Sequence, residues 1–279
     1  MKPFSLNIKG RLHTWNRPVV MGILNITPDS FYAGSRTPDT DSLKERVARM
    51  LKEGADIIDV GACSTRPGSD PVGIDEEMNR LCRALPVIRR IAPEAIISVD
   101  TFRAEIARTA ITELDCDIIN DISGGERDPE MIQTVASLQV PYVLTHCRNM
   151  TEQASSDITP DVMKDLSEKF NELSLAGVND VIIDPGIGFG KTLEQNYDIL
   201  RSLPLFHVFH LPVLVGISRK SLICKLLNID SADALDATSA LHAMCLDRGA
   251  SILRVHDVKA ARNCITIHSR LSNQTTAYA

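Results

Sequence analysis

Short apolar runs alternate with amphipathic stretches along the chain. Eight runs are rich in β-branched residues and almost continuously hydrophobic, which is typical of strands covered on both faces of a parallel sheet. They are residues 19–27, 56–62, 95–101, 117–123, 141–146, 180–186, 212–218 and 251–257. Eight strands, each followed by a helix, over roughly 250 residues predict an α/β fold, the (β/α)8 or TIM barrel.

The stretches between the runs have helical period. In residues 41–54 the apolar positions fall at i, i+4, i+7 and i+8, with Asp41 as the expected N-cap and Gly54 at the end. Residues 159–177 follow the same pattern and end at Gly177. A doubly wound open sheet is the alternative, but its first strand would usually be followed by a glycine-rich fingerprint. Here the first strand runs into NITPDS, which contains no glycine.

The pattern predicts a single domain over residues 1–279, with a barrel core from about residue 18 to about residue 270. No linker rich in proline, glycine or serine divides the chain. The segment NIKGR, before the first strand, predicts a small hairpin that closes the bottom of the barrel. The polar tail SNQTTAYA is expected to fray.

Composition excludes some classes of protein. A formal charge of -6 argues against a nucleic-acid binder, which would usually carry a basic excess. The seven cysteines are scattered, without a C-x-x-C pair, which fits reduced thiols in a cytosol. The start lacks the apolar core of a signal peptide, and no run approaches the roughly 18 apolar residues of a membrane span. A cytoplasmic protein is therefore expected.

The stretch DPGIGFGKT, residues 184–192, resembles a phosphate-binding loop without matching one. In the template G-x-x-x-x-G-K-[ST] the first glycine would stand where this chain has Pro185, which has no N–H to donate. The dinucleotide template fails as well, because the third glycine comes one residue early. What remains is Asp184 at the end of a strand, followed by a glycine turn.

Polar residues gather at the carboxyl ends of the predicted strands, where barrel enzymes place their active sites. The amino ends are poorer in such groups, since four of them begin at Val19, Ala95, Pro141 and Pro212. A single polar residue at a strand end is more often a cap or a turn residue, and Asp59, before Gly61, is expected to be one. The asymmetry as a whole favours a functional site.

The charges at this rim are sorted by strand. Carboxylates and an amide come from strands 3, 4 and 6, namely Asp184, Asn120 and Asp100. Cations come from strands 7 and 8, namely Lys220, Arg254 and His256. Phosphate sites in this fold often follow strands 7 and 8. One side of the mouth is therefore expected to hold an anion, and the other a ring rich in N–H donors. The long loops after strands 1 and 2, which carry Phe31 and Arg66, are expected to act as lids.

Eight strings resemble motifs of the dihydropteroate synthase family, in family order, from about residue 18 to the end of the chain. They are GILNITPDSF, STRPGS, SVDT, NDISGG, DPGIGFGKT, GISRKS, ATSALHA and ILRVHD. The resemblance implies a transferase that condenses (7,8-dihydropterin-6-yl)methyl diphosphate with p-aminobenzoate in folate biosynthesis, with Mg²⁺ as cofactor. It also implies a homodimer formed through the last helices, such as residues 232–247, and a sulfonamide target.

The resemblance also implies roles for individual residues. The pterin-binding positions are Asp100, Asn120, Asp184, Lys220 and Arg254. The diphosphate positions are Asn25, Arg254 and His256, of which Asn25 also helps to hold Mg²⁺. The p-aminobenzoate pocket and its loops are Phe31, Thr65, Arg66, Pro67, Phe189 and Ser221. Positioning and charge neutralisation, with Arg254, His256, Lys220 and Asn25 in the catalytic role, are expected to carry most of the catalysis.

The chain departs from the family pattern at two places. It has Gly61-Ala62-Cys63 where the family commonly has Gly-Gly-Glu, and Thr145-His146-Cys147 where the family commonly has Met-His-Met. These changes are expected to alter the wall of the pterin pocket and the hinge after strand 2, but not the reaction. Cys63 is interpreted as a plain small residue rather than a reactive thiol.

Two other functions would fit parts of the pattern. A pterin-dependent methyltransferase shares the barrel and the pterin site, but it would not need STRPG, SRKS or RVHD. A non-catalytic pterin-binding scaffold would be expected to lose Arg254, His256 or the loop after strand 1, and this chain keeps all three.

Overall fold

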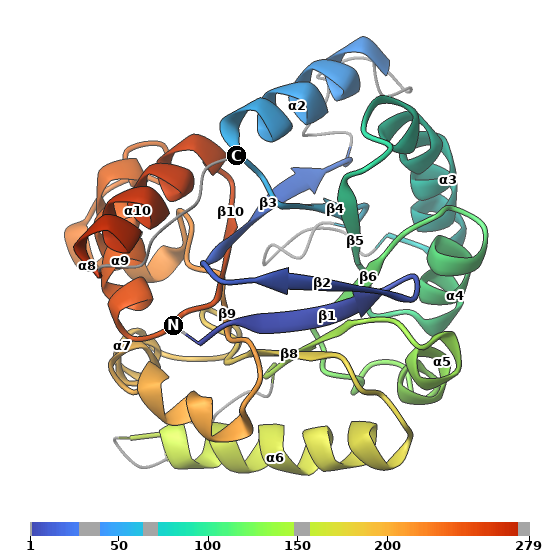
Figure 1. The fold of residues 1–279 in the computed structure, drawn as a ribbon. Helices are drawn as coiled ribbons and strands as arrows, with labels where there is room; N and C mark the ends of the chain where they lie inside the picture. Colours follow the sequence, from blue (N-terminus) through green and yellow to red (C-terminus); the bar gives the residue numbers. More distant parts are fainter. Residues whose placement is uncertain (1, 28–39, 64–71, 148–156, 273–279) are drawn as a thin grey trace.

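The computed structural model describes residues 2–27, 40–63, 72–147 and 157–272, and these form a closed parallel barrel ringed by helices (Figure 1). The barrel strands are β3 Val19–Asn25, β4 Ile57–Gly61, β5 Ile96–Asp100, β6 Ile118–Asp121, β7 Tyr142–Thr145, β8 Val181–Asp184, β9 Leu214–Val215 and β10 Ile252–Val255. Each strand lies within one of the eight apolar runs, so the predicted barrel is confirmed.

The strands pair in the order β8-β7-β6-β5-β4-β3-β10-β9. A single parallel bridge between Ile183 and Val213 joins the two ends of this sheet and closes the barrel. Helices lie between consecutive strands and cover the outside (Figure 1). They are α2 Thr40–Glu53, α3 Ile74–Ile91, α4 Ala104–Thr112, α5 Met131–Leu138, α6 Thr159–Leu175, α7 Leu193–Arg201, the 3-10 helix η1 Leu203–Phe209, α8 Ser221–Leu227, α9 Leu235–Asp247 and α10 Val258–Leu271.

The amphipathic pattern of helix α2 predicts its buried face correctly but not its first residue. Its buried face is Leu43, Val47 and Met50, as the period predicts. The expected N-cap was wrong, because Thr40 is already helical and Asp41 therefore lies inside the first turn. There its carboxylate still faces the positive end of the helix dipole. Gly54, which follows the last residue, has a φ of 96° that only glycine adopts easily.

Two apolar layers result from the alternation of side chains along the strands. The outward-facing residues pack against the helices, and the inward-facing ones fill the lower part of the barrel. The interior cluster is Val19, Met21, Ile57, Ile118, Val143, Ile182, Leu214 and Ile252, together with Leu6 and Ile8. The barrel is therefore a packed core at its bottom.

Leu6 and Ile8 come from the predicted hairpin, which crosses the bottom of the barrel (Figure 1). It consists of β1 Phe4–Ile8 and β2 Arg11–Trp15, paired antiparallel. Lys9 and Gly10 form the turn, with φ of 51° and 75°, as a two-residue hairpin of the right-handed twist requires. The expectation that a hairpin closes the bottom is confirmed.

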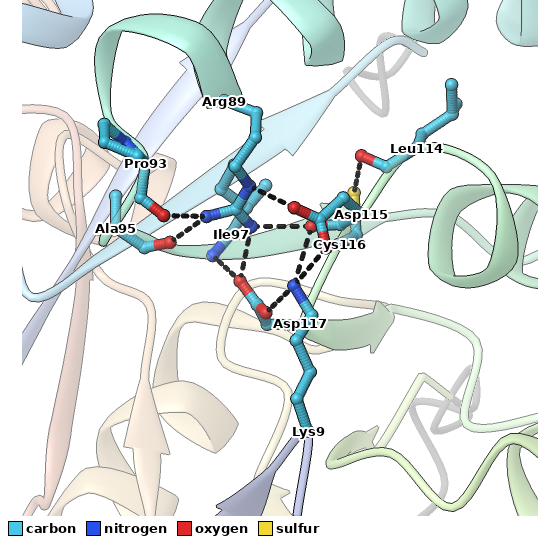
Figure 2. A network of polar contacts seen from close by, with 9 residues as sticks. All are labelled: Lys9, Arg89, Pro93, Ala95, Ile97, Leu114, Asp115, Cys116 and Asp117. Carbon is cyan, nitrogen blue, oxygen red and sulfur yellow. Dashed lines mark hydrogen bonds and ion pairs between the residues drawn. The ribbon is translucent and has the colours of Figure 1, made fainter. Parts of the chain in front are cut away.

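Charged side chains fasten this hairpin to the barrel (Figure 2). The ammonium of Lys9 lies 2.6 Å from an oxygen of Asp115 and 2.7 Å from one of Asp117. Arg89 of α3 binds the same two carboxylates, at 3.0 and 2.9 Å. Asp117 also accepts the N–H of Ile97 at 2.8 Å, so it joins α3, β5 and the hairpin.

The amino ends of the strands are thus richer in polar groups than expected. Asp56 and Asp180 stand just before β4 and β8, as Asp117 stands before β6. Asp56 accepts the N–H of Val20 at 2.8 Å, and Asp180 accepts that of Asn7 at 2.9 Å. These carboxylates stabilise the bottom face. A polar residue at the end of a strand is therefore not by itself a sign of a functional site.

Candidate active site

The apolar floor of the barrel continues upward into a charged layer. Because side chains alternate along a strand, the residue two positions after an inward-facing one also faces inward. Two positions after Ile57, Ile118, Ile182 and Ile252 of the interior cluster stand Asp59, Asn120, Asp184 and Arg254. Four strands therefore aim polar side chains at the same space, at the carboxyl end of the barrel.

Asp59 lies at the centre of this layer. Its side chain is completely buried, and its Oδ2 accepts hydrogen bonds from Arg254 Nε at 2.7 Å and from Asn120 Nδ2 at 3.0 Å. The expectation that Asp59 is a turn residue was therefore wrong. It faces the interior because it shares the inward parity of Ile57, whereas the turn begins only after Gly61.

Arg254 also reaches Asp100, whose Oδ2 lies 2.5 Å from Nη2. Burial raises the pKa of Asp100 to about 7, with Arg254 opposing the rise and the charge of Asp59 adding to it. Burial lowers the pKa of Arg254, but Asp59 and Asp100 more than reverse this, so the guanidinium stays charged.

The expected separation of anionic and cationic sides is therefore not seen. Arg254, from β10, lies between carboxylates of β4 and β5 instead of on a cationic side of its own. The physical reason is desolvation, since a buried carboxylate without a partner is costly and the nearest cation turns toward it. A diphosphate entering this site would compete with these carboxylates for Arg254.

A second group of contacts surrounds Asp184. Its Oδ1 accepts the N–H of Gly186 at 2.7 Å, while burial raises its pKa and the charge of Lys220 opposes this. The ammonium of Lys220 donates to the carbonyl of Ile187 at 2.5 Å and lies 4.6 Å from the ring centroid of Phe189. Burial lowers the pKa of Lys220 to about 8, and Asp184 partly offsets this. Lys220 thus connects the carboxylate with an aromatic face.

The loops after β9 and β10 are tied together. Arg219 binds both carboxylate oxygens of Asp257, at 2.7 and 3.0 Å, and the N–H of His256 donates to Ser218 Oγ at 3.2 Å. This arrangement keeps His256, which is exposed, beside the loop that carries Lys220. Ser221 follows Lys220 directly as the exposed first residue of α8.

Asn25 ends β3 at the same rim. A Cβ placed on Gly61 would lie 3.2 Å from Asn25 Oδ1 and 3.8 Å from the Cβ of Asp100, so Asn25 and Asp100 flank this glycine. The side chain of Asn25 makes no hydrogen bond to any residue that the structure describes. The four remaining predicted positions, Phe31, Thr65, Arg66 and Pro67, lie outside the described residues.

A dedicated metal cage is absent from the described residues, among which no three histidine, cysteine or acidic side chains could share an ion. Mg²⁺ commonly keeps several waters and takes one or two protein oxygens together with phosphate oxygens. The carbonyl oxygen of Asn25 is a ligand of that kind. Of the described residues at this rim, Asn25 offers an oxygen that could hold a Mg²⁺ ion bound together with a phosphate group.

The two departures from the family pattern differ in kind. Cys63 lies 3.7 Å from Arg103 Nη1, and burial, with Glu77 adding to it, raises the pKa of its thiol to about 12. An unreactive residue was expected there. Thr145 faces inward, pairs with Asp184 across β7 and β8, and is 2% exposed. Its hydroxyl has no hydrogen-bond partner among the described residues.

Comparison with known proteins identifies the chain. A family model described as pterin binding enzyme matches residues 21–256. The dihydropteroate synthase of Bacillus subtilis is 40% identical over 262 residues, which cover 92% of this chain and 88% of the relative. A structure of the Xanthomonas albilineans dihydropteroate synthase with 4-aminobenzoic acid superposes with a TM-score of 0.87, at 36% identity, over 96% of this chain and 98% of the other. The Coxiella burnetii enzyme in complex with pteroic acid gives 0.85, at 35% identity, over 96% and 98%.

The fold and the inward-facing polar layer thus define a pterin-binding enzyme built on a (β/α)8 barrel. Within that class the chain belongs to the dihydropteroate synthase family, transferases of folate biosynthesis.

Proposed function

We propose that this chain joins (7,8-dihydropterin-6-yl)methyl diphosphate to p-aminobenzoate. The bond between the pterin methylene carbon and the diphosphate oxygen breaks, and its electron pair leaves with diphosphate. The aniline nitrogen then bonds to the methylene carbon and loses one proton, which gives 7,8-dihydropteroate. The observation that carries the proposal is the layer of buried carboxylates and amide at the barrel mouth, in contact with Arg254 and close to Lys220.

The pterin is proposed to bind against Asp100, Asn120 and Asp184. A pyrimidine ring edge presents several N–H donors, and a buried carboxylate such as Asp184 needs donors. Asn120 donates its own N–H to Asp59, which leaves its carbonyl oxygen as an acceptor for the ring. Lys220, held beside Asp184, supplies a donor for an acceptor atom of the ring.

Arg254 and His256 are proposed to neutralise the diphosphate as it leaves. A guanidinium offers paired N–H donors that match phosphate oxygens. Since Arg254 is bound to Asp59 and Asp100, its approach to diphosphate involves an exchange of partners. Bound Mg²⁺, held with the help of Asn25, would supply further positive charge for the leaving group. Catalysis then rests on positioning and charge, without a proton transfer by a side chain.

The second substrate is proposed to lie against Phe189 and Ser221. The Phe189 ring, half-buried and in contact with the Lys220 ammonium, offers a flat face for an aromatic amine. Phe31, Thr65, Arg66 and Pro67 stay predictions for the remainder of this pocket. A sulfonamide, as a structural analogue of p-aminobenzoate, is proposed to compete for the same place.

A homodimer is proposed through the last helices. Apolar side chains stay exposed on α9 and α10, with Met244 53%, Ile267 62% and Leu271 80% accessible. These two helices pack against each other, so their outer faces can form one apolar surface. Light scattering of the purified protein tests this, and a monomer at micromolar concentration would reject it.

No helix among the described residues is long and apolar enough to cross a membrane. All seven cysteines are free thiols. A cytoplasmic location, where thiols stay reduced, is proposed on this basis.

The test of the activity is diphosphate release. With protein, pterin diphosphate and Mg²⁺, continued release of diphosphate should require p-aminobenzoate, and 7,8-dihydropteroate should form in equal amount. A methyltransferase or a non-catalytic scaffold would bind the pterin without releasing diphosphate. That outcome would reject the proposed reaction.

A further inference from the structure

The glycine-rich stretch after β8 wraps around the side chain of its own lysine. The Lys191 ammonium donates to three main-chain carbonyls: Gly186 at 2.7 Å, Phe189 at 3.1 Å and His146 at 3.2 Å. A lysine ammonium has three N–H donors, so all of them are used. Among the described residues Lys191 forms no ion pair, so its hydrogen bonds to them all go to main-chain oxygens.

Three glycines give the loop this shape. Gly186, Gly188 and Gly190 have φ of 72°, 85° and 58°, in the left-handed region that side chains disfavour. At Gly186 a Cβ would also collide with the carbonyl oxygen of His146, so this position needs glycine twice over. The result is a turn in which the carbonyls of Gly186 and Phe189 point toward Lys191.

The polarity of this loop is the reverse of that of a phosphate-binding loop, which points N–H groups at an anion. Here the N–H groups of Gly186 and Gly188 are taken by Asp184 at 2.7 Å and by Asn196 at 2.6 Å. Thr192, the last residue of the Gly-Lys-Thr string, caps α7 in a reciprocal capping box with Gln195. The loop therefore binds the Lys191 ammonium, a cation, whereas a nucleotide-binding loop binds a phosphate anion.

Lys191 reaches both substrate positions through this loop. Gly186 accepts from Lys191 through its carbonyl and donates to the Asp184 carboxylate through its N–H. Phe189 accepts from Lys191 through its carbonyl and carries the ring that faces Lys220. The third bond, to His146, fastens the loop to the end of β7.

We propose that Lys191 is a positioning residue for both substrates, which it serves by fixing Asp184 for the pterin and Phe189 for p-aminobenzoate. The proposal rests on the proposed function, since it takes the roles of Asp184 and Phe189 from there. A charged ammonium is required, because a neutral side chain cannot satisfy three converging carbonyls equally well. The positive charge of Lys191 opposes the rise that burial causes in the pKa of Asp184, and burial lowers the pKa of Lys191 to about 8.

The test compares Lys191→Gln and Lys191→Arg with wild type. Lys225→Gln, an exposed lysine of α8, is the matched control. Calorimetry gives the Kd of 6-hydroxymethyl-7,8-dihydropterin, and steady-state kinetics give kcat and the KM for p-aminobenzoate. Lys191→Gln should raise both the Kd and the KM at least tenfold and lower kcat less than threefold. Lys191→Arg, which keeps the charge, should stay within threefold of wild type in Kd and KM, as should the control.

Two results would overturn the proposal: a Kd and KM within twofold of wild type in Lys191→Gln, or an arginine variant that is as damaged as the glutamine variant. If Lys191→Gln does not fold, Lys191→Met, a neutral side chain of similar length, takes its place, and a Kd and KM within twofold of wild type in that variant would overturn the proposal. Asp184→Asn, measured in parallel, distinguishes the role of Asp184 in pterin binding from the role of Lys191 in positioning Asp184. Intact pterin binding in Asp184→Asn would reject the proposed role of Asp184 itself, whereas a loss confined to Asp184→Asn would reject only the role of Lys191.

Discussion

Asp59 is the buried carboxylate to which Arg254 and Asn120 are both bound, and Asp59→Asn removes its charge while it keeps the shape. One oxygen accepts from Arg254 Nε at 2.7 Å and from Asn120 Nδ2 at 3.0 Å. The side chain is fully buried, so solvent cannot replace either contact. The substitution therefore tests how much this charge contributes to the folded state.

The magnitude follows from the two hydrogen bonds. A bond to a charged group contributes about 1.5–3 kcal/mol and a neutral one about 0.5–1.5 kcal/mol, so two bonds that lose their charge lose about 2 kcal/mol. The change also removes like-charge repulsion, because Asp59 is one of the causes that raise the pKa of Asp100. We expect a net loss of about 1–2 kcal/mol in the free energy of unfolding, since Arg254 keeps Asp100 as a partner.

Urea-induced unfolding at pH 7, followed by circular dichroism, measures this loss. In thermal unfolding the melting temperature should fall by about 2–8 °C, since 1 kcal/mol corresponds to about 2–4 °C for a chain of this size. Asp75→Asn is the control, because Asp75 is an exposed carboxylate in the first turn of α3 and should change the stability by less than about 0.5 kcal/mol. An Asp59→Asn variant as stable as wild type would refute the reasoning, since burial of the charge would then cost as much as its bonds contribute.

The pH dependence gives a second check with a definite sign. The pKa of Asp100 is about 7 in the folded protein, because of burial first and of Asp59 in part, and about 3.9 when unfolded. A raised carboxyl pKa contributes stability that is present at low pH and is lost as the pH rises through about 7. In Asp59→Asn, Asp100 ionises more easily, so part of that loss disappears. The destabilisation should therefore be larger at pH 5 than at pH 8, and the opposite order would contradict the proposed coupling.

Four further predictions concern the proposed reaction. Asp184→Asn should weaken pterin binding by about 2–4 kcal/mol, because an amide donor would face ring N–H donors, and calorimetry measures it. Arg254→Ala and His256→Ala should lower kcat more than the affinity for the bare pterin, since both act on the leaving diphosphate, and steady-state kinetics with calorimetry separate the two effects. Thr145→Val should weaken pterin binding about threefold to tenfold while Thr145→Ser leaves it unchanged, if the buried hydroxyl pairs with the ring. Pterin affinity should fall as the pH rises through about 8, where Lys220 loses its proton, and a titration from pH 6.5 to 9.5 tests this.

The barrel could be predicted because both faces of its strands are buried. The outer cluster and the interior cluster take alternate residues of the same strands, which makes each strand a continuous apolar run. The boundaries were less accurate. Residues 212–218 were predicted as a strand, but only Leu214–Val215 is paired as β9. Pro212 has no N–H for a ladder, and Gly216–Ser218 already turn toward the loop that carries Lys220.

The alternation of side chains along a strand predicts which residues face the barrel mouth more reliably than the adjacent residue types do. Asp59 stands two residues before Gly61, and that neighbour suggested a turn. It also stands two residues after Ile57, whose side chain lies in the barrel interior, and this relation would have placed it correctly. The partner of Arg254 was beyond such reasoning, because the reach of a long side chain across the mouth depends on which carboxylates lie buried there.

The charge that the loop after β8 binds could not be predicted from its sequence. Positive φ at three glycines could be inferred from spacing, because left-handed turns favour glycine. The same backbone freedom can aim either N–H groups or carbonyls at the centre of a turn, and the two choices bind opposite charges. Pro185 excluded one of them by lacking an N–H, but it did not identify the occupant. That required His146, 45 residues earlier, whose carbonyl completes the coordination of Lys191 from the end of β7. A motif of nine residues therefore has its chemistry decided by a contact that no local pattern contains.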